Sequence, residues 1–204
     1  MTFKTNRYKV IKKAISKDVV EFVNDYLLLK ERVHDTLKET RYIIPSSSDW
    51  GGRDDQQCMG AYSMYADIAM ETLLLRCLPI VEKESKLKLW PTYAYTRVYK
   101  QGHVLEKHTD RKSCEVSTTL NLGGDMWPIY LKDIKGKEIE VKLGPGDMLL
   151  YAGCELEHWR NEFKGNCCTQ VFLHYNIQNK GNEIQMFDHR IHLGLPKWFK
   201  GKKL

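Results

Sequence analysis

The spacing of hydrophobic residues in the first third of the chain is helical. Between residues 15 and 37, apolar positions recur at the intervals that place them on one helical face. Ser16 precedes this face as a candidate N-cap, and Asp18 lies in the first turn, where a negative charge stabilises the helix dipole. The predicted buried stripe consists of Val19, Val23, Tyr26 and Leu27.

A second helix is predicted to begin after Ser63. Pro79 is expected to bend or interrupt it, because proline removes a helical hydrogen bond. Its predicted stripe consists of Met64, Ile68, Leu75 and Leu78. The segment 45–57, PSSSDWGGRDDQQ, separates the two helices and is rich in polar and turn-forming residues. It predicts a long loop, and long loops in compact domains often serve as lids or binding loops.

From Pro91 onward the hydrophobic period changes to two, which is typical of strands. In residues 92–99, TYAYTRVY, Tyr93, Tyr95, Arg97 and Tyr99 alternate with smaller residues. Further strands are predicted at 104–108, 115–122, 126–131, 138–143, 147–152 and 169–175. Many short strands without intervening helices indicate a sandwich or barrel. We therefore predict an α+β fold, a jelly roll (double-stranded β-helix) with N-terminal helices packed on the outside.

Length and composition are consistent with one soluble domain. The chain has 204 residues, of which 42% are hydrophobic and 28% charged. We expect a single domain over residues 1–204, with a helical front (1–90), a jelly-roll core (91–176) and a basic C-terminal extension (177–204). The net charge of +6 is concentrated at the two ends. Such ends either solubilise the protein or bind nucleic acid and acidic partners.

The cysteine pattern and the absence of long apolar runs indicate a reducing compartment. The six cysteines show no Cys-x-x-Cys spacing, and Cys167 and Cys168 are adjacent, which suits neither a disulfide framework nor a zinc finger. Nothing in the sequence resembles a secretory signal or a membrane span. We expect reduced thiols, a cytoplasmic location and no membrane partner; the oligomeric state is left open.

Candidate chemistry lies in the segment VLEKHTDRKSCE, residues 104–115. His108 and Asp110 are two residues apart, so on a strand their side chains point to the same side. His158, after the strand GDMLLY and a short loop, is the candidate third ligand. Two histidines and one carboxylate form a facial triad, which leaves three positions open on the metal and is typical of iron(II). The sequence thus predicts a metal centre at His108, Asp110 and His158.

Over residues 90–176 the chain resembles the iron(II)/2-oxoglutarate dioxygenases, in particular the prolyl 4-hydroxylase-like branch. The similar features are Tyr99 nine residues before His108, the His-Thr-Asp triplet, the GDMLLY strand and His158. The resemblance implies that the triad binds Fe(II) and that 2-oxoglutarate chelates the metal. With O2, the co-substrate is oxidised to succinate and carbon dioxide while a substrate C–H bond is hydroxylated. Ascorbate is a further candidate cofactor. Asp110 also looks like a hydroxylating member, since halogenating relatives carry a small residue there.

The sequence departs from this family where the distal carboxylate of 2-oxoglutarate is usually held. Most relatives have Lys or Arg nine to eleven residues after the distal histidine, and this chain has Cys167, Cys168 and Thr169. Arg160, two residues after His158, is the favoured substitute, because its planar fork suits a carboxylate. Arg97 is the alternative anchor, although a structural ion pair, for example with Glu115, is preferred for it. Tyr99 and the hydroxyl of Thr118 are the other expected co-substrate contacts, and His174 is given no catalytic role.

Three functions are compared. The favoured one is a hydroxylase acting on a peptidyl or amino-acid-like substrate, or on another small molecule. The second is a nucleic-acid demethylase of the same superfamily, but those enzymes usually carry an Arg-x-Asn run ending in a second Arg, which RNEFKGNCC lacks. The third is a jelly-roll binding module whose metal is structural or absent. A structural metal prefers a closed shell of ligands, and the open triad therefore disfavours it.

Overall fold

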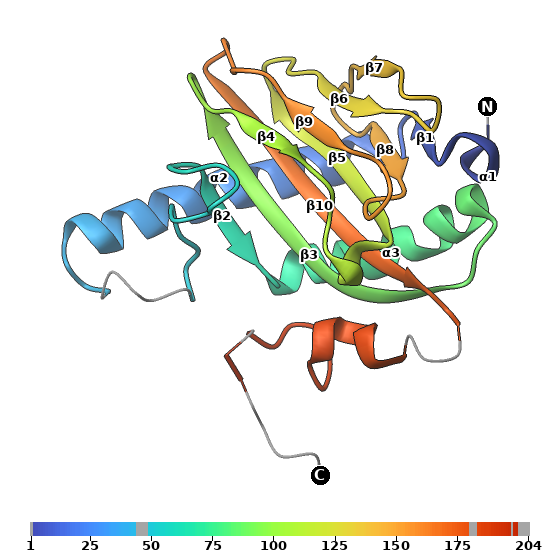
Figure 1. Cartoon of the computed structure of the whole chain (residues 1–204). Coiled ribbons are helices and arrows are strands. Elements are labelled where there is room, and N and C mark those ends of the chain that lie inside the picture. The colour runs from blue at the N-terminus through green and yellow to red at the C-terminus, as the bar shows by residue number, and fades with distance from the viewer. Residues whose placement is uncertain (1, 44–48, 180–182, 197, 200–204) are drawn as a thin grey trace.

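The strands form two facing antiparallel sheets (Figure 1). The computed structural model describes residues 2–43, 49–179, 183–196 and 198–199. In these residues the larger sheet has the order β1 (Tyr8–Ile11), β8 (Met148–Tyr151), β5 (Val116–Gly124), β10 (Cys167–Ile177), β3 (Leu89–Lys100) and β2 (Tyr62–Tyr65). The smaller sheet has the order β4 (Leu105–His108), β9 (His158–Arg160), β6 (Ile129–Lys132) and β7 (Glu138–Val141). This is the predicted jelly roll.

The two long helices, α2 (Lys17–Glu39) and α3 (Ile68–Ser85), cover the outer face of the larger sheet (Figure 1). Their buried apolar residues, such as Leu27 and Leu74, join one core with Leu120 and Leu173 of the sheet. The short elements are α1 (Phe3–Asn6) and the 3-10 turns η1 (Lys112–Cys114) and η2 (Glu183–His189). In the part of the chain that is described, no helix is long and apolar enough to cross a bilayer.

The front of the chain contributes strands as well as helices, which the sequence pattern did not predict. β1 pairs with β8 at one edge of the larger sheet, and β2 pairs with β3 at the other. Met64 therefore lies in β2 and not in a helix. The second helix begins later than predicted, because the Asp67 carboxylate caps it by accepting from the backbone N–H groups of Ala69 (3.0 Å) and Met70 (3.2 Å).

The buried face of α3 also differs from the prediction. Ile68 is 70% exposed and Leu75 is 48% exposed. The buried stripe consists of Met70, Glu71, Leu73, Leu74, Cys77, Val81 and Ser85. Because α3 is apolar on two faces, periodicity alone does not identify the buried one. The helix continues through Pro79, which lies on its exposed side, where water can bind the carbonyl that loses its helical partner.

The described part of the predicted C-terminal extension packs against the domain. The Arg111 guanidinium donates to both carboxylate oxygens of Asp188, at 2.8 and 2.7 Å, and Tyr65 donates to the same carboxylate at 2.6 Å. Arg190 and Glu71 form a second, buried ion pair. These contacts hold η2 beside β3.

All six cysteines are unpaired in the structure, and four of them are buried. We therefore expect thiol titration of the protein, denatured without reductant, to count six free thiols. Titration of the folded protein should react first with the partly exposed Cys154 and Cys167. A count of four in the denatured protein would mean that a disulfide forms and that the prediction is wrong.

Candidate active site

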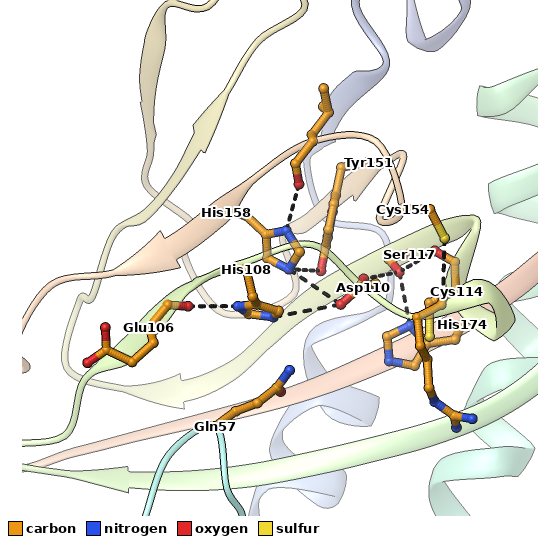
Figure 2. Close-up of polar contacts among 12 residues, drawn as sticks. Gln57, Glu106, His108, Asp110, Cys114, Ser117, Tyr151, Cys154, His158 and His174 are labelled. Carbon is orange, nitrogen blue, oxygen red and sulfur yellow. Dashed lines mark hydrogen bonds and ion pairs between the residues drawn. The ribbon is translucent and has the colours of Figure 1, made fainter.

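The two candidate histidines face each other across neighbouring strands. His108 on β4 is the register partner of His158 on β9, so both side chains project from the same face of the smaller sheet, with ring centroids 4.3 Å apart. Asp110 follows two residues after His108. Its Oδ1 lies 3.8 Å from His108 Nε2 and 3.5 Å from His158 Nε2 (Figure 2). The sheet register thus brings together the three predicted ligands.

Backbone hydrogen bonds orient both imidazole rings. His108 Nδ1 lies 2.7 Å from the carbonyl oxygen of Glu106, and His158 Nδ1 lies 2.9 Å from that of Leu156. A carbonyl only accepts, so each Nδ1 carries the proton and each Nε2 keeps its lone pair. Burial, reinforced by the neighbouring His158, lowers the pKa of His108. His108 is therefore neutral at physiological pH, with an Nε2 lone pair that could bind a metal.

The charge and spacing of the cluster fit a divalent metal. Burial alone would raise the pKa of Asp110, but its close contacts with the imidazoles of His158 and His174 and with the Ser117 hydroxyl outweigh burial, and the pKa lies well below its usual range. Atoms bound about 2.1 Å from one ion, at angles of about 90–110°, lie roughly 3.0–3.4 Å apart. The observed 3.5 and 3.8 Å contacts need only a small contraction. One anionic and two neutral ligands can thus hold a metal with open positions.

The cluster opens into a cavity of about 890 Å³ between the two sheets. Aromatic side chains of the larger sheet form one wall, contributed by Tyr65, Tyr93, Tyr95 and Phe172. The polar residues 54–57 of the predicted loop form part of its rim. The loop that was predicted as a candidate lid therefore borders the site. Residues 44–48, which include part of that prediction, lie outside the described residues.

Arg97 connects this loop to the wall of the cavity. Its Nε lies 2.5 Å from Asp55 Oδ2, and both side chains are almost fully buried. Tyr95 donates to the same oxygen at 2.9 Å. The expected ion pair of Arg97 is thus present, but its partner is Asp55 and not Glu115, whose carboxylate accepts from the amides of Asn176 and Ile177.

Gln57 is a cavity residue that sequence reasoning missed. Arg97 Nη2 donates to Gln57 Oε1 at 2.6 Å. Because arginine has only donors, this contact orients the amide with its oxygen toward Arg97 and its NH2 group away from it. Figure 2 shows the Gln57 side chain directed toward the cluster of His108, Asp110 and His158. No local pattern signals this role, which depends on where the loop folds.

Arg160 has the features expected of a carboxylate anchor. It is 1% exposed, and one of its Nη atoms donates to the Trp127 carbonyl. Its Nε and Nη2 have no hydrogen-bond partner, although both are buried. Burial lowers its pKa. A buried guanidinium with unpaired N–H groups is costly, and a bound carboxylate would satisfy both of them.

The guanidinium of Arg160 lies in the region where the family resemblance places a cation from another strand. It stacks on Trp127 at 5.0 Å, and Trp127 packs in a small core with Tyr99 and Cys168. Cys168 is one of the positions where relatives carry Lys or Arg. Arg97, by contrast, has all three of its nitrogens engaged, by Asp55, Gln57 and Tyr99. This difference favours Arg160 over Arg97.

The structure separates the two remaining predicted contacts. Tyr99 is fully buried on the inner face of β3, and its hydroxyl accepts from Arg97 Nη1 at 3.4 Å. Thr118 lies on the helix-facing side of β5, where its hydroxyl bonds to the backbone of Leu173. Its neighbour Ser117 occupies the inner face. The expected contact of Thr118 with co-substrate is therefore corrected: alternation along the strand directs its side chain away from the cavity.

Tyr151 is a second residue that sequence reasoning did not identify. Its hydroxyl lies 3.4 Å from Nε2 of His158, the atom available to a metal, and the side chain lines the cavity (Figure 2). It is the last residue of β8, within the GDMLLY strand. A phenol here can donate a hydrogen bond to an oxygen ligand in the open part of the metal site.

The lack of a side chain at Gly153 makes room for the Asp110 carboxylate. An added Cβ would lie 2.3 Å from Asp110 Oδ2 and 2.5 Å from Ser117 Oγ, and the Gly153 carbonyl accepts from the Asp110 N–H at 2.8 Å. We expect Gly153→Ala to displace the carboxylate and weaken Co(II) binding by at least about tenfold. Gly136→Ala, in a surface turn, is the control, and equal affinities in both variants would show that the close contact does not matter. Calorimetric titration with Co(II) measures the difference.

Neither a protein-family model nor a curated protein sequence matches this chain. Solved structures do. A prolyl-4-hydroxylase from Pseudomonas putida matches with a TM-score of 0.58 and 13% identity, over 87% of this chain and 96% of that one. HygX from Streptomyces hygroscopicus, with nickel, 2-oxoglutarate and hygromycin B bound, has a TM-score of 0.62 and 15% identity, over 86% and 85%. SnoN, a non-haem alpha-ketoglutarate-dependent epimerase from nogalamycin biosynthesis, matches with a TM-score of 0.61 and 11% identity, over 90% of this chain and 85% of that one. At these identities the likeness concerns the fold: the chain has the double-stranded β-helix of 2-oxoglutarate-dependent non-haem enzymes.

Proposed function

We propose that this protein is an Fe(II)- and 2-oxoglutarate-dependent oxygenase that hydroxylates a C–H bond of its substrate. The observation that carries the proposal is the inner face of β9. Its first residue, His158, belongs to the metal-ligand cluster, and its third, Arg160, is a buried arginine with two unpaired nitrogens. A metal site and a vacant carboxylate partner on one strand match the two ends of a metal-chelating dicarboxylate.

The residues of the chain have separate roles in this proposal. His108, Asp110 and His158 would hold the iron, and Arg160 would pair with the C5 carboxylate of 2-oxoglutarate. When bound, iron and co-substrate supply oxygen activation, with succinate and carbon dioxide as products. Trp127 and Tyr99 surround the Arg160 region with apolar surface and exclude water from the ion pair, which strengthens it. The Asp55–Arg97 pair fixes the loop that borders the substrate cavity.

The substrate that we propose is a peptidyl, amino-acid-like or other small molecule. The cavity volume of about 890 Å³ suits a small molecule or a short segment of chain. Aromatic walls offer apolar contact, and the Gln57 amide offers a donor to a substrate carbonyl or carboxylate. Hydroxylation is supported by Asp110 in the candidate metal cluster, at the position where the halogenating relatives carry a small residue. The epimerase SnoN shows that the fold also serves other reactions.

The two alternatives find less support. A nucleic-acid demethylase needs cations around its cavity mouth to neutralise phosphates, whereas the two arginines that line this cavity in the described part of the chain, Arg97 and Arg111, are already paired with Asp55 and Asp188. A structural metal site would be closed by further protein ligands, whereas these three residues line an open cavity.

Turnover of 2-oxoglutarate without substrate tests the proposal. The purified protein is incubated aerobically with Fe(II) and 2-oxoglutarate, and succinate is quantified. We expect slow succinate formation that requires both Fe(II) and oxygen and that stops when Mn(II) replaces iron. Binding of 2-oxoglutarate to the Co(II)-loaded protein is measured in parallel. If the protein neither forms succinate nor binds 2-oxoglutarate in the presence of metal, the proposed function is wrong.

A further inference from the structure

The second oxygen of the Asp110 carboxylate is held by a chain of two polar side chains. Ser117 Oγ lies 2.6 Å from Asp110 Oδ2, and His174 Nδ1 lies 3.0 Å from Ser117 Oγ. Ser117 is on β5 and His174 is its register partner on β10, so both side chains project from the inner face of the larger sheet. Figure 2 shows Ser117 between the carboxylate and the imidazole.

The direction of the two hydrogen bonds follows from the chemistry of the groups. Asp110 is ionised and only accepts, and its Oδ2 at 2.6 Å is a closer acceptor for the single hydroxyl proton of Ser117 than the Cys114 carbonyl at 3.2 Å, so Ser117 donates to Asp110. The Ser117 oxygen must then accept from His174, which requires the proton of a neutral imidazole to be on Nδ1. Burial keeps His174 neutral. The two hydrogen bonds therefore run from His174 Nδ1–H to the Ser117 hydroxyl and from there to Asp110 Oδ2. We call this arrangement of His174, Ser117 and Asp110 the relay.

These groups are buried and closely packed. Ser117 and His174 are 0% and 5% exposed. Gly153 fills the space behind the Asp110–Ser117 contact so closely that it has no room for a Cβ. His174 also packs against the Tyr93 ring at 4.6 Å. The carboxylate is thus fixed with Oδ2 toward Ser117 and Oδ1 toward the two histidines.

We propose that Ser117 and His174 are positioning residues that hold Asp110 as a one-oxygen ligand. This inference rests on the proposed function. The Ser117 hydrogen bond and the close packing of Gly153 hold Oδ2 away from the two histidines, which leaves Oδ1 as the oxygen that would bind the metal. Three positions then stay open, two for a chelating co-substrate and one for oxygen. Mutation of a residue that hydrogen-bonds to a metal ligand typically changes metal affinity by about 10–100-fold.

Asp110, Cys114 and His174 also form a second group whose ligand atoms lie within 4.8 Å of one another. We do not assign a metal to it. Ser117 already bonds to two of its members, and the third, the Cys114 thiol, is hydrogen-bonded to Tyr93 at 3.2 Å. The relay therefore predicts one metal ion per chain.

Titration with Co(II), followed by calorimetry and visible absorption, tests the relay without turnover. We expect Ser117→Ala and His174→Leu to weaken Co(II) binding by about 10–100-fold. His174→Asn, whose amide N–H can replace Nδ1–H, should retain most of the affinity. Thr118→Val is the matched control, because it removes a buried hydroxyl from the next position of β5 on the opposite face. Thermal unfolding of each metal-free variant verifies that it is folded.

The outcomes separate the relay from the proposed function. Wild-type affinity in Ser117→Ala would disprove the relay while leaving the metal site intact. The same follows if Thr118→Val loses as much affinity as Ser117→Ala, or if folded His174→Asn behaves like His174→Leu. A stoichiometry of two Co(II) ions per chain would favour the second group as a metal site and overturn the relay. If the wild-type protein binds no Co(II), the proposed function fails together with it.

Discussion

In the Arg160→Ala variant, the dissociation constant for 2-oxoglutarate is expected to rise by about two to three and a half orders of magnitude. This corresponds to the roughly 3–5 kcal/mol lost when a buried charge loses its partner. Arg160 is the buried arginine whose Nε and Nη2 have no partner, so a bound carboxylate has a direct place there. The measurement is calorimetric titration of 2-oxoglutarate into Co(II)-loaded protein without oxygen. Co(II) affinity itself should be unchanged, because the three ligands are untouched.

Arg160→Lys and Arg97→Ala are the informative comparisons. The lysine keeps a positive charge but loses the planar fork, so we expect an intermediate affinity for 2-oxoglutarate. Arg97→Ala leaves Asp55 buried without its cation, and it should loosen the loop and lower the melting temperature of the metal-free protein. If Arg160→Ala binds 2-oxoglutarate normally while folded Arg97→Ala does not, the anchor is Arg97 and our assignment is wrong.

Replacement of Asp110 by alanine should abolish both metal binding and 2-oxoglutarate turnover. The carboxylate is the anionic member of the cluster, and its Oδ1 lies within 3.8 Å of the Nε2 atoms of both His108 and His158. Two neutral imidazoles alone cannot offset the desolvation of a divalent ion in this partly enclosed site. We expect the loss of Co(II) affinity to exceed the roughly 10–100-fold loss that is typical when a residue hydrogen-bonded to a metal ligand is replaced.

Asp25→Ala is the matched control for this experiment. It makes the same chemical change on the exposed surface of α2, and it should leave both metal affinity and succinate formation as in the wild type. Unchanged turnover in Asp110→Ala would show that Asp110 does not bind the metal, and the proposed triad of two histidines and one carboxylate would be wrong. An intermediate loss, equal to that of Ser117→Ala, would instead mean that Asp110 orients the histidines without binding the metal.

The strand pattern of the second half could be predicted because a side chain's face is a local property. Alternation alone places Tyr93, Arg97 and Tyr99 on one face of β3, and in the structure Tyr93 and Arg97 line the cavity while Tyr99 lies buried beside them. The His-x-Asp spacing likewise brings His108 and Asp110 to one side. His158 was a candidate from its place after the GDMLLY strand and from the family resemblance, and its register opposite His108 is what brings it to the other two residues.

Local pattern was insufficient wherever a residue's partner comes from a distant part of the chain. Asp55 rather than Glu115 pairs with Arg97, since the loop folds across β3. Thr118 was placed on the inner face, but the observed register of β5 with β10 puts Ser117 there. His174, which no motif marks, lies within reach of Ser117 through the same register.

The sequence by itself determined the jelly-roll class, the inner face of β3 and the placing of His108 and Asp110 on one side, because side-chain alternation and the His-x-Asp spacing act over two or three residues. Only the tertiary structure decided which arginine is free to bind a carboxylate, which face of α3 is buried and which side chains orient Asp110. These depend on the pairing of strands and loops far apart in the chain, and hydrogen-bond partners and burial exist only after that pairing has formed.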